Sequence, residues 1–140
     1  MIGILDWEMS TIGHPLSDLT NLLSPYLTAS SAKAKSVGRA HEGFVPGATP
    51  GLPTRSQLID WYKEVAGWDP AEDMLWGDAF ATYRNTIIMQ GIAARYAVRQ
   101  ASSAQAKSFG EMMGPYAEVA WGVVEEFKSK RAEKGGKAKL

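Results

Sequence analysis

The sequence predicts a mainly α-helical domain, and three observations support this prediction. Apolar residues recur every three or four positions over residues 16–27, 58–66, 80–98 and 109–127, which is typical of amphipathic helices. Helix-start signals precede two of these stretches. The one short run that is typical of a buried strand, Ile2–Leu5, lies at the N-terminus. We therefore expect about five or six helices and a short N-terminal β remnant.

Length, composition and charge exclude several classes of protein. The 140 residues are enough for one domain with a buried core. No run of about 18 apolar residues is present, so we expect no membrane span. The chain has no cysteine, which excludes disulfides and cysteine-bound zinc. The net charge of zero combines a charge of +5 at residues 128–140 with a charge of −5 on the rest of the chain. The rest of the chain has no stripe of basic residues, so we do not expect it to bind nucleic acid.

The first predicted helix begins near Pro15, a residue that suits the first helical position. Asp18 lies near the helix start, where the helix dipole favours a carboxylate. Pro25 is expected to end or kink the helix. Residues 28–53 are predicted to be a long loop, because prolines and glycines gather in its second half, and His41 is expected to be solvated there.

The next helix is bounded by two local signals. Thr54 and Gln57 have the spacing of a capping box, and Gly67 is suited to a left-handed C-cap, with Trp68 as its hydrophobic contact. We expect one face of the helix to be buried, with the residues Leu58, Ile59, Tyr62, Val65 and Ala66.

Asp69 and Pro70 predict a further helix start, which Gly77 is expected to interrupt. From Asp78 a long helix is predicted whose buried stripe contains Phe80, Tyr83, Ile87, Gly91, Ala94 and Val98. Gly91 would permit a close approach between helices. Arg84 lies next to this stripe, where it either pairs with a carboxylate or serves as a polar anchor for a substrate.

The last helical region extends to Phe127, and Gly114-Pro115 should kink it or split it in two. Residues 1–127 therefore form the predicted folded domain. Residues 128–140 contain little apolar surface and are predicted to be a disordered basic tail.

The N-terminal segment carries the chain's most specific motif. The run Ile4-Leu-Asp-Trp-Glu8 is followed by Gly13-His-Pro15 and then by Asp18-Leu19. An Asp at the end of a strand is typical of a turn, and it also suits Mg²⁺, which takes carboxylate and phosphate oxygens. The combined pattern resembles the aminoglycoside phosphotransferase-like family of small-molecule kinases. It looks especially similar to the kinase-like domains related to those fused to acyl-CoA dehydrogenases.

The resemblance implies a fold and a set of roles. The chain would be the C-terminal helical lobe of a protein-kinase-like fold. Asp6 would bind Mg²⁺, and Glu8 would hold a second ion directly or through water. Asp18 would brace the catalytic loop from beneath, and Arg84 would be a candidate substrate-lobe residue.

A working kinase of this family also needs an ATP-binding glycine-rich loop, a lysine that contacts the ATP phosphates and the Asp of a catalytic loop. None of these motifs occurs in this chain. We therefore expect a fragment of an ATP- and Mg²⁺-dependent phosphotransferase acting on a small-molecule hydroxyl and inactive alone. ATP and Mg²⁺ would serve the full-length relative, and we do not expect this chain to hold them tightly. The alternatives are a non-catalytic helical binding module, with Trp61 and Trp68 exposed, and a pseudo-enzyme fragment.

The chain ends in Ala138-Lys139-Leu140, which resembles variants of the Ser-Lys-Leu peroxisomal address. A peroxisomal import receptor is therefore a candidate partner, and the alternative location is the cytoplasm.

Overall fold

The computed structural model describes residues 3, 10, 12–31 and 41–137, and this part of the chain is mainly helical, as the sequence predicts. It contains the helices α1 (Leu16–Ser30), η2 (Glu42–Phe44), α3 (Arg55–Ala66), α4 (Met74–Ala97), α5 (Ala106–Glu111) and α6 (Met113–Lys137). No strand occurs in these ranges, and the β remnant predicted at 2–5 lies outside them except for residue 3. No helix in the described part of the chain is long and apolar enough to cross a membrane.

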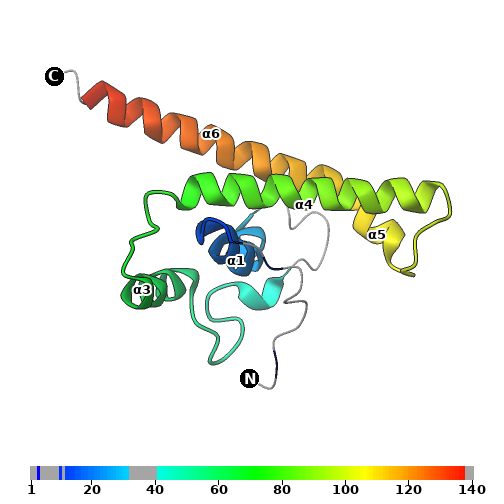
Figure 1. The fold of residues 1–140 in the computed structure, drawn as a ribbon, viewed down its shortest axis with the longest axis horizontal. Helices are drawn as coiled ribbons and strands as arrows, with labels where there is room; N and C mark the ends of the chain where they lie inside the picture. The colour runs from blue at the N-terminus through cyan, green and yellow to red at the C-terminus, as the bar shows by residue number, and fades with distance from the viewer. Residues whose placement is uncertain (1–2, 4–9, 11, 32–40, 138–140) are drawn as a thin grey trace.

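The helices form two layers. The long helices α4 and α6 run antiparallel to each other, and α5 lies at the end where the chain turns from one to the other (Figure 1). Helix α1 lies against α4, and η2 and α3 lie farther out in the same layer as α1 (Figure 1). Helix α1 is therefore covered from two sides, by α4 and by the η2–α3 segment.

The core beside α1 is built from the helix's leucine face. Leu16, Leu19 and Leu23 are buried together with Tyr26 and Met74. On the outer side this cluster contacts Phe44, Leu58, Ile59, Tyr62 and Trp68. The prediction that α1 ends or kinks at Pro25 is wrong about the end, because the helix continues to Ser30. Burial of Tyr26 and Ala29 beyond the proline favours that continuation.

Helix α4 is continuous through Gly77, so the predicted interruption there is wrong. A Cβ at Gly77 would lie 2.6 Å from Thr20 Cγ2 and 2.9 Å from Leu16 Cγ. Gly77 is therefore the point where the backbone of α4 approaches α1. The helix also begins later than expected, at Met74, because residues 71–73 form a turn in which Ala71 N donates to Asp69 Oδ1 at 3.0 Å.

The apolar stripe predicted to be buried on α4 is largely exposed, which corrects the sequence prediction. Phe80, Tyr83, Ile87 and Val98 are 44–62% exposed, whereas Ala81 and Thr82 are 2% or less exposed. The helix has apolar residues on more than one side, so the periodicity did not identify the packed side. Gly91 makes no close helix contact either, because its Cβ would meet only Arg95 Nη1, at 3.7 Å.

Small and β-branched residues form the seam between α4 and α6. Val119, Ala120 and Val123 of α6 are buried, as is Ala81 of α4. The last helical region is split, as predicted near Gly114-Pro115, and the break between α5 and α6 falls at Met112.

Helix α6 extends to Lys137, where the sequence predicted a disordered tail from residue 128. Glu125 pairs with Lys128 at 3.5 Å, and Glu126 pairs with Lys130 at 2.7 Å. Pairs at this spacing each stabilise an exposed helix by about 0.2–0.5 kcal/mol. Together with the helix-favouring Lys, Arg, Ala and Glu residues of this stretch, they account for the extension.

Local signals around α3 were predicted correctly. Thr54 and Gln57 form the capping box, and Gly67 closes the helix with φ 64°. The face predicted to be buried is only partly so. Leu58, Ile59 and Tyr62 pack on the core as partly buried residues, whereas Ala66 is exposed and Val65 is 90% exposed, because α3 meets the core only through its inner face.

His41 was expected to be solvated, but the structure shows it engaged with α1. Its Nδ1 lies 2.8 Å from the hydroxyl of Thr28, and its ring meets Phe44 edge-on. Burial lowers the pKa of His41 below its ordinary value of 6.5. His41 therefore fixes the loop to the end of α1.

Substitution of Gly77 by alanine is predicted to lower the free energy of unfolding by about 1–3 kcal/mol, because the added methyl overlaps Thr20 and Leu16. Gly91→Ala is the matched control in the same helix. It should leave stability unchanged or raise it by up to about 1 kcal/mol, because alanine is the better helix former and the site is open. Urea denaturation followed by circular dichroism measures both changes. Equal effects of the two substitutions would show that α1 and α4 do not approach at Gly77.

Candidate functional site

The segment that leads into α1 carries the predicted metal residues, but Asp6 and Glu8 lie outside the described residues. Within the described part of the chain, no group of three or more His, Asp or Glu residues is placed to hold a metal ion. The site can therefore be built only from the beginning of α1 and the side chains that face it.

The beginning of α1 is fixed by His14. The backbone N–H of Leu16 donates to His14 Nδ1 at 3.2 Å, which satisfies one of the helix's unpaired N–H groups. The accepting role of Nδ1 places the ring proton of a neutral His14 on Nε2. The ring also meets Trp68 edge-on, with centroids 5.4 Å apart. His14 is therefore held by two contacts that orient the segment entering α1.

A cavity of about 300 Å³ lies at this end of the α1–α4 interface. Trp76 and Phe80 of α4 stack in parallel with centroids 5.5 Å apart, and both line the cavity. The remaining lining residues are Gly13, His14, Leu16, Ser17, Thr20 and Gly77. The described lining contains no carboxylate. Its geometry suits an apolar or flat group lying against the two aromatic rings.

Arg84 joins α4 to the first half of α1. Its Nη2 donates to Asn21 Oδ1 at 2.7 Å, and its Nη1 lies 3.4 Å from Ser17 Oγ. The expected carboxylate partner is not observed among the described residues, which corrects that interpretation. Both partners are neutral, so no described carboxylate compensates the charge of this guanidinium, which lies four residues after Phe80 in α4.

Asp18 lies in the first turn of α1 and is exposed. Its side chain makes no hydrogen bond or ion pair with the described residues. Ser17, which touches both the cavity and Arg84, is its neighbour in the helix. The structure thus brings Arg84 to Ser17 and Asn21 in the first half of α1, without a contact between Arg84 and Asp18 among the described residues, and it does not place either of them relative to Asp6.

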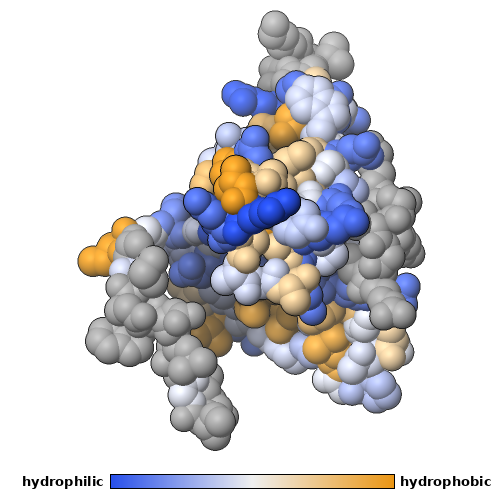
Figure 2. Space-filling view, turned by 90° about the vertical axis from the view of Figure 1, so that its right-hand side faces the viewer, coloured by the Kyte–Doolittle hydropathy of each residue, from blue (hydrophilic) through white to orange (hydrophobic). Residues whose placement is uncertain are grey.

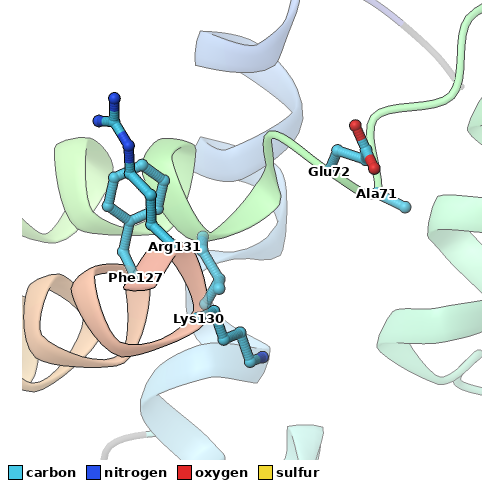
Figure 3. Close-up of a pocket in the computed structure, with 6 residues that line it drawn as sticks. Ala71, Glu72, Phe127, Lys130 and Arg131 are labelled. Carbon is cyan, nitrogen blue, oxygen red and sulfur yellow. The ribbon is translucent and has the colours of Figure 1, made fainter. Parts of the chain in front are cut away.

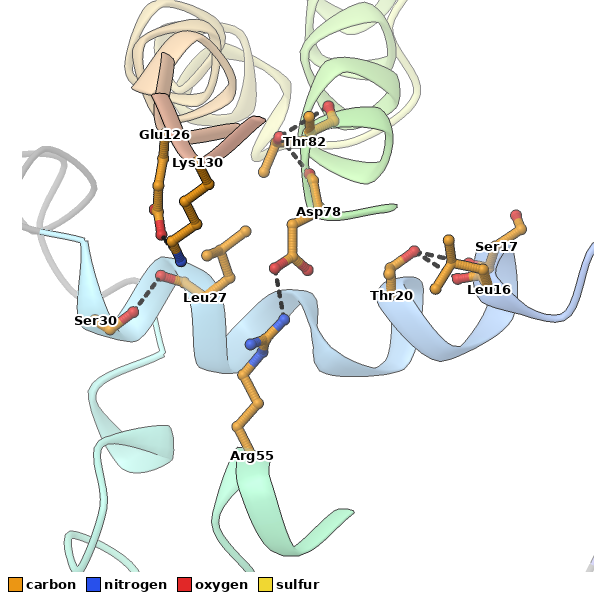
Figure 4. A network of polar contacts seen from close by, with 11 residues as sticks. Leu16, Ser17, Thr20, Leu27, Ser30, Arg55, Asp78, Thr82, Glu126 and Lys130 are labelled. Carbon is orange, nitrogen blue, oxygen red and sulfur yellow. Dashed lines mark hydrogen bonds and ion pairs between the residues drawn. The ribbon is translucent and has the colours of Figure 1, made fainter. Parts of the chain in front are cut away.

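A buried ion pair behind the cavity was not predicted from the sequence. Asp78 follows Gly77 of the cavity wall, and its Oδ2 accepts from Arg55 Nη2 at 2.5 Å (Figure 4). The Asp78 side chain is 4% exposed and that of Arg55 is 30% exposed. This pair connects α3 to α4. The partners are 23 positions apart in the sequence, so no local signal indicated the pair.

The environment of Asp78 affects its ionisation. Burial raises the pKa of this carboxyl above its ordinary value of 3.8, and the charge and hydrogen bond of Arg55 oppose that rise. The Asp78 Oδ1 and Arg55 Nε atoms are buried without a hydrogen-bond partner in the described structure, so the pair is only partly satisfied.

Comparison with known proteins found similar segments in long acyl-CoA dehydrogenase proteins. The chain is 31% identical over 121 residues to acyl-CoA dehydrogenase family member 10 of Mus musculus, covering 86% of this chain and 11% of that protein. It is 30% identical over 120 residues to family member 11 of Homo sapiens, covering 85% of this chain and 15% of that protein. With the probable acyl-CoA dehydrogenase IBR3 of Arabidopsis thaliana it shares 27% identity over 128 residues, covering 89% of this chain and 15% of that protein.

The chain is thus similar to one segment of much longer proteins that carry acyl-CoA dehydrogenase names. This segment makes up 11–15% of their length. No protein-family model matches the chain. No solved structure matches it either.

Asp78→Asn is predicted to change how stability depends on pH. Because the pKa of Asp78 is raised in the folded protein, the folded state binds more protons than the unfolded state between pH 3.8 and that raised value. Ionisation of Asp78 therefore costs stability as the pH rises through this window, and the asparagine variant lacks this cost. Urea denaturation between about pH 4 and pH 7 should show the variant gaining stability relative to the original protein as the pH rises.

Asp69→Asn is the control for this experiment. Asp69 is an exposed carboxylate whose pKa is lowered by its hydrogen bond with Lys63. Its ionised form therefore stabilises the folded state, and this stabilisation is lost as the pH falls. The two variants should thus show pH trends of opposite sign. A relative gain by the original protein over Asp78→Asn at higher pH would contradict the assignment for Asp78.

Proposed function

We propose that the chain is the C-terminal helical lobe of an ATP- and Mg²⁺-dependent phosphotransferase that acts on a hydroxyl group of a small molecule. The observation that carries this proposal is the arrangement at the beginning of α1. The residues that resemble the kinase-like motif run directly into this helix. Its first turn carries the exposed Asp18 and, next to it in the sequence, Ser17, whose Oγ lies 3.4 Å from Arg84 Nη1. The mainly helical fold agrees with such a lobe.

The roles of the residues follow from the chemistry of phosphoryl transfer. Bound Mg²⁺ would neutralise charge on the β- and γ-phosphates, and Asp6, with Glu8, would hold it through carboxylate oxygens. Asp18 would accept hydrogen bonds from backbone N–H groups of a catalytic loop, a role that suits an exposed carboxylate with no described partner. Arg84 would orient a polar group of the substrate.

The comparisons support placement within a longer protein. The matched relatives contain this segment as 11–15% of their length, so this chain corresponds to one part of such a protein. The dehydrogenase names belong to those relatives. For this chain we propose only the phosphotransferase role, with import through a peroxisomal receptor at Ala138-Lys139-Leu140 as a further proposal and the cytoplasm as the alternative location.

A non-catalytic binding module remains the second candidate, because aromatic side chains are exposed. Trp61 and Trp76 are 52% and 53% exposed. Trp68, expected to be exposed as well, packs against the core instead. Ligand binding by this chain that does not depend on magnesium would favour the binding module over the phosphotransferase lobe.

The chain alone is predicted not to turn over ATP. ADP release from Mg²⁺-ATP should equal that of the no-protein blank, because the residues that cradle ATP and the catalytic Asp are not in this sequence. A coupled-enzyme ADP assay measures this release. Turnover well above the blank that disappears in Asp6→Ala would contradict the prediction.

The phosphotransferase role itself is tested in the longest polypeptide that the gene encodes. Asp6→Ala should abolish Mg²⁺-dependent ADP release there, and Asp18→Asn should lower kcat about a hundredfold or more through the displaced catalytic loop. The midpoint of thermal unfolding should change little in Asp18→Asn, because this side chain is exposed. Exposed Asp69→Asn is the control that should keep full activity. Full activity in both Asp6→Ala and Asp18→Asn would exclude the proposed roles.

A further inference from the structure

A groove runs between the beginning of α4 and the second half of α6. It consists of two adjoining hollows of about 380 and 470 Å³, which share Phe127 and Arg131 in their linings. Ala71 and Glu72 face Phe127 and Lys130 across the first hollow, as Figure 3 shows. Each hollow has a volume within the range of about 300–1,000 Å³ that small-molecule sites occupy.

The floor of this groove is apolar and partly preformed. Trp76 and Phe80, stacked with an interplanar angle of 3°, line the second hollow together with Val124. Leu75 lines the first hollow, and Phe127 lies between the two. The stacked rings are 53% and 44% exposed, so they offer apolar surface without any need to rearrange the helix. On a different face, at the α5 end of the molecule, apolar residues form separate patches among hydrophilic ones (Figure 2).

The rim of the groove is cationic, and one of its charges is uncompensated. Lys128 and Lys130 pair with Glu125 and Glu126 on α6. Arg131 makes no ion pair or hydrogen bond with the described residues, although it lines both hollows. Glu72, the carboxylate in the described lining, already has an interaction of its own. A guanidinium at the rim of an aromatic groove favours an anionic group at one end of an apolar ligand.

We propose that this groove binds a soluble amphipathic anion, that is, an aromatic or aliphatic body that carries one carboxylate, phosphate or sulfonate group. The body lies over Phe127 and the Trp76–Phe80 pair, and the anionic group pairs with Arg131. The hollows are concave on both sides of Phe127, a shape that fits single molecules better than the surface of a membrane. The groove shares Trp76 and Phe80 with the cavity at the beginning of α1, but it uses none of the residues proposed for phosphoryl transfer and does not depend on that function.

The test uses two probes that share an aromatic body and differ in charge. Anilinonaphthalene sulfonate is the anionic probe, and N-phenylnaphthylamine is its uncharged counterpart. The protein should bind the anionic probe more tightly in fluorescence titrations, and the preference should decrease as salt is added. Arg131→Gln should weaken binding of the anionic probe about threefold to tenfold and leave the uncharged probe unaffected, whereas Phe127→Ala should weaken both.

Two matched variants test the location of the site. Arg95→Gln removes an exposed arginine from the other end of α4, and Tyr83→Ala removes an exposed aromatic side chain outside the groove. Neither should change the affinity for the anionic probe, and circular dichroism checks that every variant is folded. Equal affinity for the two probes, or an unchanged affinity in Arg131→Gln, would overturn the proposal. Sedimentation with phosphatidylcholine–phosphatidylserine vesicles that is lost in Arg131→Gln would also overturn it, in favour of a membrane surface.

Discussion

The structure depends on the close approach of α1 and α4 at Gly77. The absent side chain lets Leu16 and Thr20 reach the backbone of α4, and Arg84 and Asn85 extend the contact along α1 through Ser17, Asn21 and Ser24. Burial of the leucine face of α1 follows from this approach, and the α3 segment packs on the opposite side of that face. A larger residue at position 77 would separate the two helices and open both layers.

The same contact determines which apolar side chains remain exposed on the surface. Because α4 uses Gly77, Ala81 and Thr82 for packing, several of its large apolar side chains remain exposed, including Trp76, Phe80, Tyr83 and Ile87. Trp76 and Phe80 consequently line both the cavity at the beginning of α1 and the groove beside α6. The proposed catalytic brace, Asp18, lies in the first turn of α1, next to Ser17, which lines the first of these. One interface thus leaves two hollows that share the rings of Trp76 and Phe80, and Arg131 lines the one beside α6.

Short-range features could be predicted from the sequence, and long-range ones could not. The capping box at Thr54 and the left-handed Gly67 depend on residues a few positions apart, so spacing was sufficient. Gly77 and Gly91 lie in the same helical pattern, and only the position of α1 decides which one is packed. The Arg55–Asp78 pair joins two separate helices. For the candidate site, the sequence gave no sign of the cavity, and the roles predicted for Asp6, Glu8, Asp18 and Arg84 remain predictions.

Amide hydrogen exchange tests the central claim, that the α1–α4 contact is the most stable part of the molecule and that α3 is attached to it. The amides of Leu19–Leu23 in α1 and of residues 78–82 in α4 should exchange slowest and with a common opening free energy. Helix α3 is held only by its inner face and by the Arg55–Asp78 pair. Its amides should therefore exchange through a separate local opening with a lower opening free energy. Protection in α3 equal to that in α4, together with faster exchange in α1, would contradict this account.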